Sequence, residues 1–219
     1  MKRIFLVFAL LGFCTVYAGA QTADADDNQS WNDLQITVPI NNQFDFTLAG
    51  TLRFGKNITR LNDRRIAVGL VYKPSKAKSW SFQPFYWNIV ARNASGKFTT
   101  EHRLNFRAIY RFPFKRIAVS HRSWIERRLR EPRNSWRYRP SLTFEKDVGK
   151  IISGVKLFVT EEVFYDSILK KFSRNRFSAG INKTLTKNAS VDVFYLRQND
   201  GFSRPGDLNV IGTTWRVKF

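Results

Sequence analysis

The sequence predicts an all-β fold: a single antiparallel up-and-down transmembrane β-barrel of 10 or 12 strands that follows a cleaved signal peptide. Three observations predict it. Runs in which apolar and polar side chains alternate fill most of the chain, as strands with one apolar and one polar face require. The N-terminus has the features of a secretory signal. The last run ends the chain on an aromatic residue of its apolar face.

The N-terminal residues 1–20 are predicted to be a signal peptide. Residues 1–3 (Met-Lys-Arg) are basic, residues 4–16 form an apolar run, and residues 18–20 (Ala-Gly-Ala) form a small-residue cleavage site. The apolar run is too short to cross a bilayer as a helix. Cys14 lies within it, so the mature chain has no cysteine for disulfides or thiolate metal sites.

The rest of the chain is predicted to form one domain. Residues 21–30 are small and acidic without a period, which predicts a flexible lead-in. Residues 31–219 contain about eleven strand-like runs separated by turn residues, and we expect them to form the barrel. Because bacterial single-chain barrels use even strand numbers, one run must be split or missed, which gives 10 or 12 strands.

The first three runs are amphipathic, and the fourth is not. Asn41 and Asn42 supply a tight turn before the second run. The fourth run, residues 79–92, is aromatic on both faces, so the pattern does not assign its orientation. The apolar faces of the first three runs consist of Leu34, Ile36 and Val38, then Phe44, Phe46, Leu48, Leu52 and Phe54, then Ile66, Val68, Leu70 and Tyr72.

The fifth to eighth runs set an apolar face against a face rich in Arg and Glu. On the sixth run, His121, Ser123 and Arg127 interrupt the apolar face. The apolar residues are Leu104, Phe106, Ala108, Tyr110 and Phe112, then Ile117, Val119, Ile125 and Leu129, then Trp136, Tyr138, Leu142 and Phe144, then Val155, Leu157, Val159, Val163 and Tyr165.

The last three runs complete the pattern. The ninth and tenth alternate more loosely, with apolar faces made of Phe177, Ala179, Ile181 and of Val191, Val193, Tyr195. In the eleventh, Ile211 shares a face with Trp215, Val217 and Phe219. This closing strand resembles that of bacterial outer-membrane barrels, so we expect Trp215, Val217 and Phe219 to be a C-terminal barrel signature.

Alternation alone does not say which face points inward. A soluble barrel encloses its apolar face, whereas a membrane barrel turns that face to lipid. The runs reach about 10 to 15 residues, the length of a tilted membrane-spanning strand, and soluble strands are usually shorter. The polar face mixes Arg with Glu, which suits an enclosed interior. These features and the signal peptide favour the outer membrane of a Gram-negative-type bacterium.

The chain is strongly basic, with 37 Lys and Arg against 17 Asp and Glu and a net charge of +20. Export makes nucleic acid an unsuitable partner, and the sequence has no zinc-ligand spacing or phosphate-binding loop. We expect outer-membrane lipid and the phosphates of lipopolysaccharide to balance the charge, and the barrel-assembly machinery to insert the protein. We expect no cofactor and no metal.

The inward polar face is the candidate functional site. Inward side chains of neighbouring antiparallel strands approach to about 5 Å, close enough for guanidinium and carboxylate groups to pair. This ladder either braces the barrel or forms a narrow, anion-preferring pore. A third alternative is a soluble periplasmic or secreted ligand-binding barrel. The ladder consists of Glu101, Arg103, Arg107, Arg122, Glu126, Arg128, Arg137, Arg139, Glu145, Glu162 and Arg176.

An enzyme is not expected. The two histidines, His102 and His121, both fall on apolar faces. Lipid hydrolysis by a Ser–His pair needs an orienting partner, and Ser123 shares the face of His121 without a carboxylate. We therefore predict no catalytic residues, and an outer-membrane hydrolase is disfavoured.

The order of polar motifs resembles a known family. The chain has Glu101-His-Arg103, then residues 122–128 with Glu126-Arg-Arg128, then Arg137-Tyr-Arg139, then Glu162-Val-Phe164, then Arg176 with Gly180. Over residues 31–219 this series is similar to the domain of unknown function 2490 family of bacterial outer-membrane barrel-like proteins. The resemblance implies an architecture and a compartment but no biochemical activity.

Overall fold

The computed structural model describes residues 26–93, 95–203 and 205–219, and the predicted signal peptide lies outside them. No helix in these ranges is long and apolar enough to cross a membrane. The described residues form eleven strands: β1 (Asp27–Pro39), β2 (Phe44–Gly55), β3 (Arg60–Tyr72), β4 (Trp80–Arg92), β5 (Phe98–Phe112), β6 (Ala118–Leu129), β7 (Ser135–Asp147), β8 (Val155–Asp166), β9 (Lys171–Thr186), β10 (Ala189–Asp200) and β11 (Leu208–Lys218).

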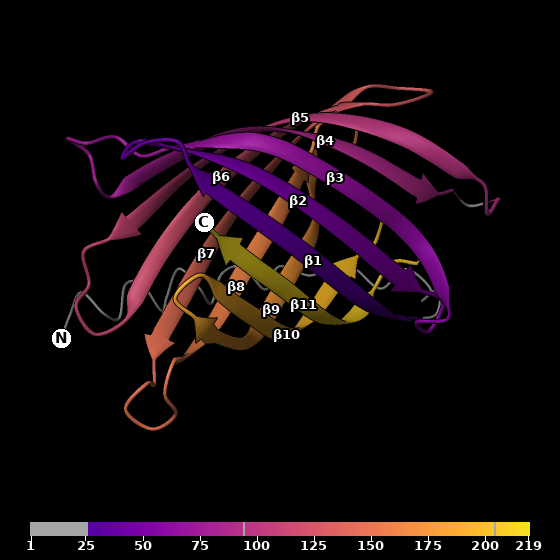
Figure 1. Ribbon diagram of the computed structural model, residues 1–219. Coiled ribbons are helices and arrows are strands. Elements are labelled where there is room, and N and C mark those ends of the chain that lie inside the picture. Colours follow the sequence, from indigo (N-terminus) through magenta and orange to yellow (C-terminus); the bar gives the residue numbers. More distant parts are fainter. Residues whose placement is uncertain (1–25, 94, 204) are drawn as a thin grey trace, which may run out of the picture.

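The eleven strands close into one barrel in chain order (Figure 1). Strands adjacent in the chain pair antiparallel, whereas β1 and β11 pair in parallel, from Asp27 beside Leu208 to Thr37 beside Lys218. The predicted number of 10 or 12 strands is therefore wrong. Direction reverses at every hairpin, so an odd number leaves the first and last strands pointing the same way, and a parallel ladder can still join them.

The barrel has two rims, and β1 and β11 run from one to the other in the same direction. The C-terminal rim is the end at which β1 and β11 finish, and the opposite rim is the end at which they begin. β1 starts at Asp27, inside the segment 21–30 that the sequence predicts to be a flexible lead-in. The carboxylate of Asp27 accepts hydrogen bonds from the backbone N–H groups of Lys56 and Asn57, at 3.1 and 2.9 Å, in the turn after β2. These bonds tie the start of β1 to the barrel.

The apolar faces of the strands point outward and the charged faces point inward. Phe46, Phe106 and Leu157 are 38, 44 and 46% exposed, whereas Arg103 and Arg139 are 8 and 6% exposed. A barrel with a conventional apolar core would show the reverse. The orientation predicted from the run lengths and the mixed charges is therefore confirmed at these positions.

Aromatic rings form a continuous row on the outer wall near the C-terminal rim. Phe44 stacks on Tyr72 with ring centroids 4.9 Å apart, and Tyr72 lies 6.3 Å from Phe82. Phe82 stacks on Trp80 at 5.9 Å, and Trp80 lies 4.9 Å from Tyr110. The row crosses β2 to β5, where these strands begin or end. Membrane barrels have aromatic girdles at both edges of their apolar outer band.

The structure settles the orientation of β4, which the sequence pattern left open. The rings of Phe85 and Trp87 lie 5.6 and 5.2 Å from the inward-facing ring of Trp124 on β6. Ile89, on the same face of β4, is almost fully buried. Gly69 of β3 makes room for this face, because a Cβ at Gly69 would lie 2.4 Å from Cβ of Phe85. The wall of β4 therefore places large aromatic side chains inside the barrel.

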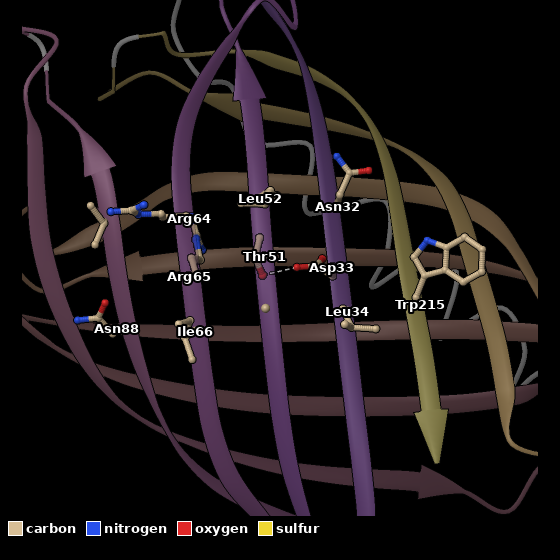
Figure 2. A pocket seen from close by; sticks show the side chains of 12 residues that line it. Asn32, Asp33, Leu34, Thr51, Leu52, Arg64, Arg65, Ile66, Asn88 and Trp215 are labelled. Carbon is tan, nitrogen blue, oxygen red and sulfur yellow. Dashed lines mark hydrogen bonds between the residues drawn. The ribbon is translucent and has the colours of Figure 1, made fainter. Parts of the chain in front are cut away.

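The outer wall is hollowed over β1 to β4 and β11 (Figure 2). Gly50 of β2 lies between Leu34 of β1 and Ile66 of β3, and its position has no side chain. The hollow has a volume of about 490 Å³, and the side chain of Trp215 also lines it.

Candidate functional site

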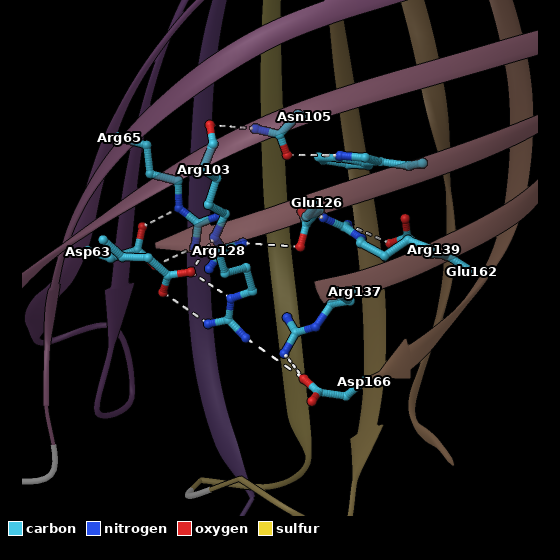
Figure 3. Close-up of polar contacts among 12 residues, drawn as sticks. Asp63, Arg65, Arg103, Asn105, Glu126, Arg128, Arg137, Arg139, Glu162 and Asp166 are labelled. Carbon is cyan, nitrogen blue, oxygen red and sulfur yellow. Dashed lines mark hydrogen bonds and ion pairs between the residues drawn. The ribbon is translucent and has the colours of Figure 1, made fainter. Parts of the chain in front are cut away.

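The inner wall toward the opposite rim carries most of the predicted Arg/Glu ladder, and Figure 3 shows its central members. All eleven predicted residues lie on β5 to β9. Alternate residues of each strand face inward, and the register places Arg103 beside Arg128 and Glu162 beside Arg176. Nine of the eleven join one network of ion pairs. The exceptions are Arg107 and Glu145.

The first part of the network is centred on Glu101. Its carboxylate accepts hydrogen bonds from Nε of Arg103 at 2.7 Å, and from Nε and Nη2 of Arg128 at 2.5 and 2.9 Å. The second contact is forked, which is the strongest arrangement of guanidinium and carboxylate. Nη1 of Arg128 lies 3.9 Å from the carboxylate of Asp166, which also accepts a hydrogen bond from Arg137 at 3.1 Å.

Glu126 connects this part to the rest of the network. Its carboxylate lies 3.5 Å from Nη1 of Arg103 and accepts a hydrogen bond from Nη1 of Arg139 at 2.7 Å. The side chain of Glu126 has no exposed surface. An enclosed carboxylate of this kind depends on its guanidinium partners, because no water is available to solvate it.

Glu162 extends the network to β9. It accepts hydrogen bonds from Arg139 at 2.9 Å and from Arg122 at 2.5 Å, and Nη1 of Arg176 lies 3.9 Å away. The connected network thus contains six arginines and four carboxylates, an excess of two positive charges. Full pairing therefore leaves this network with a net positive charge.

Arginine and aromatic side chains alternate in a pile that crosses the barrel at the height of the ion-pair network. The ring of Trp124 lies between two guanidinium groups, with its centroid 3.8 Å from the guanidinium carbon of Arg107 and 3.7 Å from that of Arg139. Arg139 also lies 4.4 Å from the ring centroid of Phe164. The face of an aromatic ring attracts a cation, and the attraction is greater where water is excluded.

The pile continues from β9 to β1, which are not neighbouring strands. The guanidinium carbon of Arg176 lies 4.7 Å from the ring centroid of Phe164 and 4.8 Å from that of Trp31. Arg53 of β2 also contacts Trp31, with its guanidinium carbon 3.5 Å from the ring centroid. Trp31 in turn belongs to a small buried apolar cluster with Leu196, Leu208 and Val210. Side chains from separate walls therefore meet in the interior.

Two predicted ladder residues lie outside the network. Arg107 has no ion pair among the described residues, and its guanidinium carbon stacks 4.2 Å from the ring centroid of Phe85 as well as on Trp124. Glu145 pairs with Lys156 at 3.3 Å near the C-terminal rim, where both side chains are more than a third exposed. The pattern gave Glu145 the correct face but did not give its height in the barrel.

The prediction omitted several members of the site. Asp166 faces inward like Glu162, and that shared face was the signal for it. Asp63 pairs with Arg65 at 2.7 Å inside β3, and the predicted ladder includes neither residue. The inward ring of Phe164 had no distinguishing signal, since aromatic residues occur on both faces of β8. Trp31 is the only aromatic residue of β1 and lies on the face opposite Leu34 and Ile36, so the alternation of that strand was the signal for it.

The predicted C-terminal signature and the histidines lie on the outer wall. Phe219 is 71% exposed, and its backbone N–H donates to the carbonyl of Thr37 at 3.1 Å. Trp215 and Val217 share its face. Nε2 of His121 lies 3.0 Å from the hydroxyl of Ser123, which lies 3.1 Å from the hydroxyl of Tyr138. No carboxylate takes part in this chain of hydrogen bonds.

His102 also makes an outer-wall contact, with Nδ1 2.5 Å from the hydroxyl of Tyr86. Neither histidine has a group of metal-binding neighbours: among the described residues, no three His, Cys, Asp or Glu side chains are grouped to hold a metal ion.

Comparisons with known proteins return few matches. No curated protein matches the chain. Among solved structures, a KdgM porin has a TM-score of 0.45 and 11% identity, over 75% of this chain and 81% of that one. An anion-selective porin from Comamonas acidovorans has a TM-score of 0.41 and 12% identity, over 81% of this chain but only 54% of its own length. The family model described as protein of unknown function (DUF2490) matches residues 28–209, and the chain belongs to that family.

Proposed function

We propose that the protein is an integral outer-membrane β-barrel whose Arg/Glu interior braces and closes the barrel, and that its role in the envelope is structural. The observation that carries this proposal is the single network of six arginines and four carboxylates that joins β5 to β9. It is packed by the pile of arginine and aromatic side chains that crosses from β9 to β1.

The outer wall supports a membrane location. Ile66, Leu104 and Ile211 are each more than half exposed, and such residues occur around the barrel. A water-soluble protein rarely exposes so extensive an apolar surface, whereas lipid covers it at no cost. This argues against the soluble ligand-binding barrel. We infer that lipid surrounds the wall and that the assembly machinery recognises the C-terminal strand.

The interior supports bracing. The side chains of Glu126, Trp124 and Phe164 point inward and are 0 to 3% exposed, so water does not reach the middle of the network. Each arginine that crosses between strands joins two elements of the wall. Bracing of this kind resists strand separation, because opening the wall leaves buried charges without partners.

A narrow anion-preferring pore is the second candidate, and one observation favours it. The network has two surplus positive charges, and Arg107 and Arg53 lie in the interior without an ion pair among the described residues. A ring of arginine attracts anions and repels cations. Both candidates share the barrel and differ in whether ions pass.

Conductance of the purified protein in a planar bilayer separates them. A bracing barrel inserts and shows no single-channel steps, whereas a pore shows steps with a reversal potential that favours anions. Arg128→Ala gives the second comparison. Reduced stability without any new conductance supports bracing, and altered anion preference in a stably folded barrel supports the pore.

A further inference from the structure

Figure 2 shows side chains that line the hollow on the outer wall. Gly50 is the floor, because a Cβ at this position would meet no atom within 4 Å. Leu34 and Ile66 flank it in register on β1 and β3, and Trp215 lies beside Leu34 on β11. Apolar atoms make up almost all of the surface that faces the hollow, and the volume of about 490 Å³ falls within the range of small-molecule sites.

The next row of side chains, toward the opposite rim, adds a cation. Arg64 of β3 lies beside Leu52 of β2 on one side and Val90 of β4 on the other, and all three line the hollow. Arg64 has no ion pair among the described residues. Its nearest aromatic contact is distant, 6.0 Å from the guanidinium carbon to the ring centroid of Phe98. An arginine on a lipid-facing wall is unfavourable unless an anion accompanies it.

Two carboxamides also line the hollow, and both have side-chain partners. Asn32 donates to the hydroxyl of Ser30 at 3.1 Å and accepts from that of Thr213 at 2.9 Å, and Nδ2 of Asn88 lies 3.5 Å from Nδ1 of His102. Asn32 lies beside Leu52 in the row of Arg64, and Asn88 lies beside Ile66 in the row of Gly50. The hollow therefore combines an apolar floor with the exposed cation of Arg64 at its edge, which matches a lipid: hydrocarbon next to an anionic headgroup.

We propose that the hollow binds one anionic glycerophospholipid, with an acyl chain over Gly50 and the phosphate on Arg64. The proposal rests on the membrane location proposed above. A guanidinium binds phosphate through two parallel hydrogen bonds, so Arg64 distinguishes an anionic from a zwitterionic headgroup by charge and geometry. Gly50 supplies the space, because any larger residue would occupy the position of the chain.

Each part of the site has its own substitution. Gly50→Leu fills the hollow, because a Cβ at Gly50 meets no atom within 4 Å and the rest of the new side chain extends into the space above it. Arg64→Gln removes the charge and leaves the hollow. Arg127→Gln is the matched control, because Arg127 also faces outward near the opposite rim but stacks on Trp136, at 5.0 Å, and lies outside the hollow.

Native mass spectrometry of the detergent-purified protein measures binding of phosphatidylglycerol and phosphatidylcholine with identical acyl chains. We expect the wild type and Arg127→Gln to bind phosphatidylglycerol about tenfold more tightly than phosphatidylcholine. Arg64→Gln should lose this preference, and Gly50→Leu should lose tight binding of both lipids.

Several outcomes would overturn the proposal. These are equal binding of the two lipids by the wild type, unchanged binding by Gly50→Leu, or an equal loss of preference in Arg127→Gln. Tighter binding of lipid A than of phosphatidylglycerol, in the same assay, would reject the assignment to a glycerophospholipid. A wild-type protein that stays soluble without detergent would instead refute the membrane location itself.

Discussion

Glu126→Gln is the most direct test of the bracing role. The substitution keeps the size of the side chain and removes its charge. Glu126 is fully enclosed and lies between Arg103 of β5 and Arg139 of β7, at 3.5 and 2.7 Å. Without the carboxylate, two buried guanidinium groups face a neutral amide whose NH₂ end cannot accept a hydrogen bond.

The structure sets the expected magnitude. Removing one partner of a buried ion pair costs about 3–5 kcal/mol, since the remaining charge is left without compensation. Arg103 keeps Glu101 at 2.7 Å and Arg139 keeps Glu162 at 2.9 Å, so the lower end of that range applies. We expect the free energy of unfolding to fall by about 3 kcal/mol. With a urea slope of about 1–3 kcal/mol/M, the unfolding midpoint should fall by about 1–3 M.

Urea unfolding in lipid vesicles, followed by tryptophan fluorescence and by heat-modifiable migration on a gel, measures this change. Glu145→Gln is the control, because Glu145 pairs with Lys156 at 3.3 Å while 37% exposed, and an exposed pair contributes about 0–1 kcal/mol. If both variants lose less than about 1 kcal/mol, the network does not brace the barrel and the reasoning is refuted.

The remaining predictions concern other parts of the barrel. Arg128→Ala should lower the free energy of unfolding by about 3–5 kcal/mol, measured in the same urea assay, without producing conductance; a stable variant would contradict bracing. Trp124→Ala should lower the free energy of unfolding by about 3–5 kcal/mol, and Trp124→Phe should lower it clearly less, because phenylalanine keeps a ring between the two guanidinium groups. Gly69→Ala should lower the free energy of unfolding by about 1–3 kcal/mol because its Cβ would clash, whereas Gly50→Ala should raise it by about 0.5–1 kcal/mol. Equal effects of the two substitutions would show that the inner wall relaxes around the added methyl group. Phe219→Ala should change stability by less than about 0.5 kcal/mol but slow insertion by the assembly machinery in reconstituted vesicles; unchanged insertion would exclude a signal role for Phe219.

The strands and their two faces could be predicted from the alternation in the sequence. A strand turns successive side chains to opposite sides, so the period is local and can be read without tertiary information. Phe46 and Arg103 therefore lie on the faces that the pattern assigned to them. The same local period assigned the inward residues of the ladder, including Glu126 and Arg139. It failed for β4, where both faces are aromatic and polarity cannot separate them.

The closure of the barrel and the pairing of its inward charges could not be predicted from the sequence, because both depend on the folded arrangement of all the strands. Closure by a parallel β1–β11 pair is a contact between the two ends of the described chain, and no local pattern records it. Height along the barrel depends on the register of all intervening strands. Register therefore separates Glu145 from the network and brings Arg176 to Trp31, although both arrangements follow the same alternation. Pairing of charges across an enclosed space is a property of the closed wall, whereas the alternation that permits it belongs to each strand alone.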